Sequence, residues 1–140
     1  MKALLALIFA SLLMSSSCNK ENAGDCQGDL VCTQDFRSVH VQVMNSTAPY
    51  QLDHYITKRH SDSMVIDIHS ALSAYEDSLF RAQGTYPVLN DGHMQLTSRQ
   101  GTGFTFIGYV NNLEVIRENY VIGHDCCHIV KISGRAQVNL

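Results

Sequence analysis

The chain has 140 residues, of which 45% are hydrophobic and 16% are charged. Its formal net charge of −3 at pH 7 gives the surface no electrostatic reason to bind nucleic acid, so we expect no such partner. The length suits one ordinary domain and not two, and the apolar content is enough for a folded core.

The N-terminus has the three parts of an export signal. Lys2 is followed by the uncharged, mostly apolar run 3–14 and then by the small residues 15–17. The run is shorter than the about 20 residues that a helix needs to cross a bilayer, but it suits the core of a signal peptide. We therefore predict that residues 1–17 are a signal peptide and not a retained membrane anchor.

Cys18 follows these small residues directly, an arrangement that resembles a bacterial lipobox in the looser form of Bacteroidota lipoproteins. Ser15 stands where the usual motif has leucine, and the alternative is a plain signal peptide cut nearby. The resemblance implies that Cys18 is the lipidated first residue of the mature protein, carrying acyl chains such as palmitate. Two acyl chains are enough for stable anchoring, so the expected partner at this end is a membrane.

Residues 18–31 are expected to form the lipidated cysteine and a flexible tether. Segment 19–25 is polar and contains a glycine, and its Lys20-Glu21 pair resembles the surface-export signals of Bacteroidota lipoproteins. We therefore expect an outer-membrane lipoprotein that faces either the periplasm or the cell surface.

Period-two alternation predicts several short strands. Val39, Val41 and Val43 alternate with His40, Gln42 and Met44 in segment 36–44, which is typical of a half-buried strand. Asparagine tolerates positive φ, so Asn111-Asn112 predicts a two-residue hairpin turn, and Gly123 is expected to end the strand that follows it. The other predicted strands cover 50–57, 64–68, 85–89, 103–110, 113–122 and 126–133.

The hydrophobic period changes to that of a helix in segment 70–83, and Gly84 is a plausible stop signal. One helical face is predicted to contain Ala71, Leu72, Tyr75, Leu79 and Ala82. The fold class is therefore mainly β: an antiparallel β-sandwich or open barrel of about seven strands over 32–140, with one inserted short helix that covers an edge or end.

Four cysteines remain besides Cys18, namely Cys26, Cys32, Cys126 and Cys127. An even number outside the cytoplasm suggests two disulfides, and four cysteines allow three pairings. A bond between the neighbours Cys126 and Cys127 would be strained, so the better pairings join the first two cysteines to the last two, in either register. The two ends of the domain would then be adjacent in space.

A family resemblance rests on the two ends of the domain. Cys32 precedes the alternating valine strand, and the last predicted strand opens with Cys127, His128 and Ile129. This looks like a transthyretin-like domain of the carboxypeptidase regulatory-like type found in bacterial lipoproteins, although the middle of the chain, with its helix, departs from that pattern. The resemblance implies a non-catalytic sandwich with Cys32 bonded to Cys127, which leaves Cys26 for Cys126.

The run from His124 to His128 contains the residue types that bind zinc. An alternative interpretation is therefore a metal site with His124, Cys126 and His128 as ligands. Zinc sites usually space their cysteines by two to four residues, whereas adjacent cysteines on a strand point to opposite faces. Disulfides are the better interpretation in an oxidising compartment.

Four further histidines, His54, His60, His69 and His93, lack the tight spacing of a local metal motif. We expect them to be scattered and solvent-facing, and we expect no cofactor. The chain also lacks the Gly-x-Ser-x-Gly and His-Glu-x-x-His motifs of hydrolases.

The functional expectation is a lipid-anchored, non-catalytic binding or structural accessory module of the cell envelope, with an unknown protein or glycan partner. A periplasmic metal-binding protein and a small envelope hydrolase are the alternatives.

Overall fold

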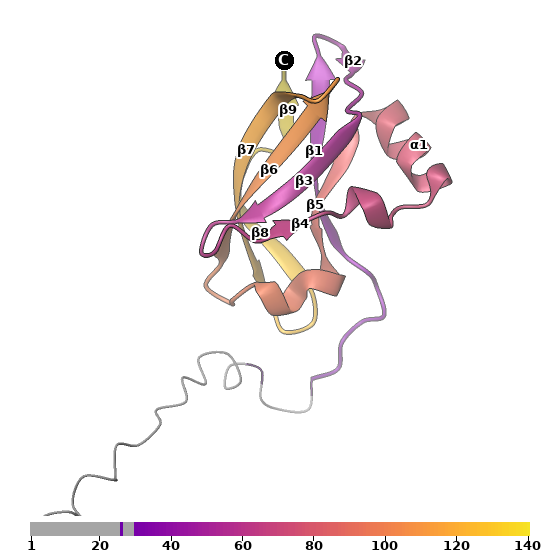
Figure 1. Cartoon of the computed structure of the whole chain (residues 1–140). Helices are drawn as coiled ribbons and strands as arrows, with labels where there is room; N and C mark the ends of the chain where they lie inside the picture. Colours follow the sequence, from indigo (N-terminus) through magenta and orange to yellow (C-terminus); the bar gives the residue numbers. More distant parts are fainter. Residues whose placement is uncertain (1–25, 27–29) are drawn as a thin grey trace, which may run out of the picture.

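The computed structural model describes Cys26 and residues 30–140 (Figure 1). The predicted signal peptide, Cys18 and most of the predicted tether lie outside the described residues. The strands are β1 (Ser38–Asn45), β2 (Ala48–Pro49), β3 (His54–Arg59), β4 (Val65–Ile66), β5 (Thr85–Asn90), β6 (Thr102–Val110), β7 (Leu113–His124), β8 (Ile129–Ser133) and β9 (Gln137–Asn139). The helices are the α-helix α1 (Ala74–Gln83) and the 3-10 helices η1 (His69–Ala71) and η2 (Asp91–Leu96). No helix in this described part is long and apolar enough to cross a membrane.

The strands form two sheets, which confirms the mainly β sandwich class with one short α-helix. In the first sheet, β1 pairs with β2 and β5 in antiparallel fashion and with β9 in parallel. The second sheet is antiparallel throughout, in the order β4-β3-β6-β7-β8. The parallel β1–β9 pair departs from the expected all-antiparallel sandwich, because β9 returns along β1 after a turn through Gly134.

The core lies between the two sheets. The three alternating valines of β1 are buried, as predicted, and face aromatic residues of the second sheet. The Thr57 hydroxyl of β3 donates a hydrogen bond of 2.6 Å to the Val88 carbonyl of β5 and so joins the sheets across the core. The largest fully buried side chains are those of Tyr55, Tyr86, Phe104, Phe106 and Tyr120.

The helix is shorter than predicted because a capping box fixes its start. The Ser73 hydroxyl accepts a hydrogen bond from the Glu76 backbone N–H, and the Glu76 carboxylate accepts one from the Ser73 N–H. Gly84 ends the helix with a φ of 60°, as predicted.

The residues that were predicted to share one helical face are mostly exposed. Tyr75 is 72% exposed and Leu79 is 40% exposed, and the described helix has no fully buried residue. The helix lies against β5 and β2 at the side of the sandwich (Figure 1). Phe80 of the helix and Leu72, which precedes it, pack against the core.

Two predicted features around β7 had different outcomes. Asn111 and Asn112 have φ values of 50° and 63°, as the predicted hairpin turn requires. Gly123, however, lies inside β7, which continues to His124. A Cβ at Gly123 would lie 2.9 Å from the Ser98 carbonyl oxygen, so this glycine admits a crossing backbone segment and does not end the strand.

The Asp91 carboxylate connects three distant parts of the chain. One oxygen accepts a hydrogen bond of 2.8 Å from the Arg37 backbone N–H just before β1, and it lies 2.7 Å from Nδ1 of His128. The other oxygen accepts one of 2.8 Å from the Ile129 N–H at the start of β8. Burial acts to raise the pKa of Asp91, but these hydrogen bonds outweigh it and the net pKa is lowered.

Two disulfides lie close to this carboxylate. Cys26 is bonded to Cys126 and Cys32 to Cys127, which is the pairing that the family resemblance implied. Their sequence separations are 100 and 95 residues. The first bridge to form closes a loop of roughly 100 residues. The second then closes a remaining loop of only about seven residues, so it removes much less entropy from the unfolded chain than the first.

We predict that Asp91→Asn destabilises the fold by about 2–4 kcal/mol, because three donors lose a charged acceptor in a nearly buried place. Chemical denaturation at pH 7 measures this. The matched control is Glu114→Gln, which breaks an exposed pair with Arg117 and should cost much less than Asp91→Asn. Equal losses in the two variants would contradict the role of Asp91.

The lowered pKa of Asp91 also has a pH consequence. The unfolded chain, in which Asp91 has its ordinary pKa of 3.8, binds the proton at a higher pH than the folded chain does. The free energy that ionised Asp91 contributes to folding is therefore present above that pH and is lost as the pH falls through the lower pKa of the folded state. The stability of the Asp91→Asn variant should therefore decline less steeply in acid than that of the wild type.

We predict strongly non-additive losses on removing the disulfides. In the chain-entropy model, replacing either bonded pair by alanines costs about 2 kcal/mol, whereas replacing all four cysteines costs about 7 kcal/mol. Denaturation of the three variants measures these costs. Alkylation of the wild type without reductant should add no mass for these four cysteines, and equal, additive losses of 4–5 kcal/mol per bridge would contradict the nested-loop model.

Candidate functional site

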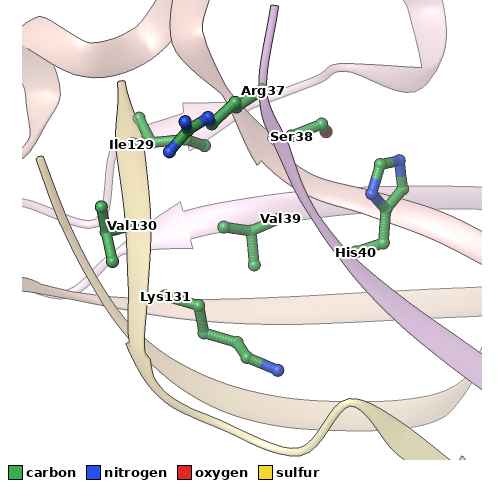
Figure 2. A pocket seen from close by; sticks show the side chains of 7 residues that line it. All are labelled: Arg37, Ser38, Val39, His40, Ile129, Val130 and Lys131. Carbon is green, nitrogen blue, oxygen red and sulfur yellow. The ribbon is translucent and has the colours of Figure 1, made fainter. Parts of the chain in front are cut away.

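A groove lies between β1 and β8, which come from different sheets. Its volume is about 540 Å³. Figure 2 shows the two strands on either side of it, with Val39 of β1 between them. The lining residues are Arg37, Ser38, Val39, His40, Ile129, Val130 and Lys131.

Both walls of the groove are strands with a partner on one side. β9 pairs only with Gln42–Met44 of β1, so the first half of β1 is paired with β5 alone. Among the strands that the structure describes, β8 pairs with β7 alone. Strand edges of this kind leave backbone donors and acceptors that another extended segment can use.

The groove has an apolar floor and a basic rim. Val39 and Ile129 are buried, whereas Arg37 and Lys131 are exposed. Arg37 lies 4.0 Å from the Asp125 carboxylate, a long contact between half-exposed side chains. Burial lowers the pKa of His40, against a smaller opposing effect of a hydrogen bond with the Ser38 backbone, and so disfavours the charged form of this ring. The fixed charges that line the groove are therefore positive.

Asp91 fixes one end of the groove. It bonds the backbone of Arg37 on one wall and that of Ile129 on the other, and its own N–H donates to the Arg37 carbonyl at 3.0 Å. The two walls are thus held together at this end by backbone contacts and do not depend on side-chain packing alone.

The cysteine and histidine cluster lies beside this end, and one ligand atom from each of Cys26, His124 and Cys126 falls within 4.8 Å of the others. The Cys126 sulfur is in a disulfide and is not a thiolate ligand. His128 is 5% exposed, and both of its ring nitrogens have partners: Nδ1 lies 2.7 Å from Asp91, and Nε2 lies 2.9 Å from the Thr33 hydroxyl. The alternative ligand set of His124, Cys126 and His128 therefore offers no common metal site in this disulfide-bonded state.

Asp125 shapes the turn that holds these residues. Its carboxylate accepts hydrogen bonds from the backbone N–H groups of His128 and Cys127, at 2.7 and 3.0 Å. These two bonds, the stronger from His128, lower the pKa of Asp125. Nδ1 of His124 accepts a hydrogen bond of 3.2 Å from the Cys126 N–H in the same turn.

The expectation of scattered, solvent-facing histidines was wrong for most of them. Of the four distant histidines only His60 is exposed, and its ring lies 2.8 Å from the Thr105 hydroxyl. His93 lies 2.8 Å from the Asn90 side chain. The structure brings His54 and His69 together, with their Nδ1 atoms 2.9 Å apart. This pair was missed because the two residues are joined through a loop and a two-residue strand, and not by a spacing within one element.

Comparisons with known proteins identify no relative. The sequence matches no protein-family model, no curated protein and no solved structure.

Proposed function

We propose that this protein is a lipid-anchored, non-catalytic binding module of the cell envelope that holds an extended, acidic peptide segment of a partner protein in the β1–β8 groove. The observation that carries the proposal is the presence of two strand edges, each paired on one side, along a groove with an apolar floor and a basic rim.

The strand edges favour an extended occupant. A peptide in β conformation alternates its side chains between two faces and presents backbone hydrogen-bonding groups at its sides. In the groove its backbone would pair with β8 or with the first half of β1, while alternate side chains would contact Val39 and Ile129.

The charges favour an acidic occupant. Arg37 and Lys131 reach the rim from opposite walls, so a carboxylate on the bound segment has a cation on either side. Charges at the rim of an interface act chiefly on the rate of association and on the choice of partner. A glycan, the other partner class expected from the sequence, would bind through hydroxyl groups and would not respond to the sign of these charges.

The position in the envelope is part of the proposal. Two disulfides favour an extracytoplasmic location, and the residues around Cys18 resemble a lipobox. Only seven residues lie between Cys18 and Cys26. A chain of that length spans at most roughly 30 Å, so lipid on Cys18 would keep the groove near the membrane surface. The likeness to transthyretin-like domains belongs to the same proposal.

We predict that a nine-residue peptide of alternating valine and glutamate binds the groove. Amide NMR signals of 38–41 and 129–133 should shift on titration, whereas a peptide with lysine in place of glutamate should leave them unchanged. Lys131→Glu should weaken the binding about tenfold, because it replaces attraction at the rim by repulsion.

The matched control is Lys58→Glu, which reverses the same charge on β3 of the same sheet, outside the groove. This variant should bind the acidic peptide as the wild type does. Binding of neither peptide, or shifts that map to another surface, would contradict the proposed groove. Equal binding of the acidic and basic peptides would contradict the role of the rim charges.

We predict that Cys18 carries the membrane anchor. Cells expressing the wild-type chain and fed a radiolabelled fatty acid should label the protein, and the protein should sediment with membranes. Cys18→Ser should abolish both, because no other residue supplies the thiol that is acylated. Labelling that persists in Cys18→Ser would overturn the lipoprotein proposal and leave the groove proposal untouched.

A further inference from the structure

A second cluster of titratable side chains lies where β3 begins. His54 is the first residue of β3, and His69 is the first residue of η1. Asp67 lies just before η1, and one ligand atom from each of these three side chains falls within 4.8 Å of the others. Asp77 of α1 stands behind His69, with its Oδ1 atom 3.1 Å from Nε2 of the ring.

The hydrogen bond to Asp77 selects the tautomer of the neutral His69 ring. A carboxylate accepts, so Nε2 carries the proton and Nδ1 of the neutral ring keeps its lone pair. That lone pair points at Nδ1 of His54, 2.9 Å away. A metal-ligating imidazole usually donates the N–H of one ring nitrogen to a carboxylate and binds the metal through the other nitrogen. His69 has this arrangement, with Nε2 bonded to Asp77 and Nδ1 facing His54.

The spacing of the two nitrogens suits a shared ion. Zinc bonds imidazole nitrogen at about 2.0–2.1 Å, so two such ligands in tetrahedral arrangement lie about 3.4 Å apart. The rings would need to part by roughly half an ångström to admit the ion. Both rings are only half-buried, and their centroids are 5.2 Å apart at an interplanar angle of 60°.

Asp67 supplies the third ligand. It is exposed, and its Oδ1 atom accepts a hydrogen bond of 3.0 Å from the Ser70 N–H, which orients the carboxylate toward η1. Two imidazoles and one carboxylate make three protein ligands, and the exposure of Asp67 leaves the fourth position to water.

The aromatic surroundings hold the two imidazoles in place. The Tyr55 ring packs against His69 with centroids 5.0 Å apart, and Tyr109 stacks on His54 at 6.1 Å. Among the described side chains, the Tyr55 hydroxyl is the buried polar group without a hydrogen-bond partner.

We propose that His54, His69 and Asp67 form a site for a divalent transition-metal ion of the zinc type, with Asp77 as the carboxylate that orients His69. Imidazole suits zinc, copper and nickel, whereas the hard cations magnesium and calcium prefer oxygen ligands. The ion connects β3 to η1 and, through Asp77, to α1, a helix with no fully buried residue. It therefore fastens this helix to the second sheet.

The rival arrangement is a hydrogen bond without an ion, in which His54 Nδ1–H donates to the lone pair of His69. Both arrangements share the Asp77 contact, so they differ in one measurable property, the affinity for metal. The site is independent of the β1–β8 groove, which none of its residues lines.

Zinc titration of the full chain tests the proposal. The protein is purified from membranes in detergent, with its disulfides intact and without a histidine tag, treated with a chelator and then dialysed. Isothermal titration calorimetry with zinc chloride should give saturable binding of one ion per chain, and zinc should raise the unfolding temperature. His54→Gln should remove this binding, and Asp67→Asn and Asp77→Asn should each weaken it by 10-fold or more.

We expect the Asp67→Asn variant to fold, because the asparagine side-chain oxygen can still accept the hydrogen bond from the Ser70 N–H and the residue is exposed. Loss of zinc binding in this variant therefore cannot be attributed to unfolding. The matched control is His93→Gln, which removes a half-buried histidine elsewhere and should leave the isotherm unchanged. The proposal is overturned if the wild type shows no saturable zinc binding, or if His54→Gln and Asp67→Asn, folded by their unfolding curves without zinc, bind zinc as the wild type does.

Discussion

The Asp91 carboxylate is the interaction on which the rest of this structure depends. It follows β5 directly, and through it the start of β1 and the start of β8 are held at one point. Charged acceptors form the stronger hydrogen bonds in proteins, and this one serves Arg37, 54 residues before it, and His128 and Ile129, 37 and 38 residues after it. The groove exists because β1 and β8 belong to different sheets and are joined at this end.

The two disulfides join the same two regions of the chain as Asp91 does, through residues that lie outside the sheets. They connect the chain before β1 to the turn before β8, so the covalent and hydrogen-bonded connections reinforce each other. His128 links the two systems, since its ring contacts both Asp91 and Thr33, the residue after Cys32. His128, which has the residue type of a metal ligand, here has both ring nitrogens in contact with other side chains.

Local patterns in the sequence predicted local structure well. The alternating valines of β1, the Asn111-Asn112 turn and the Gly84 stop each depend on neighbouring residues, and each is present. Features that depend on distant partners were not predictable. Gly123 reads as a strand breaker until Ser98 is seen to cross it, and Asp91 reads as a turn residue until Arg37 and His128 converge on it. The His54–His69 pair escaped for the same reason.

The Cys26–Cys126 bond determines how the domain would respond to mechanical load. A pull on the chain ahead of Cys26 passes through this bond into the turn between β7 and β8, and it does not run along the backbone into β1. The ladder between β1 and β5 is therefore shielded from being peeled apart strand by strand. A domain held by its N-terminal end can be dragged by a bound partner while both walls of the groove keep their spacing.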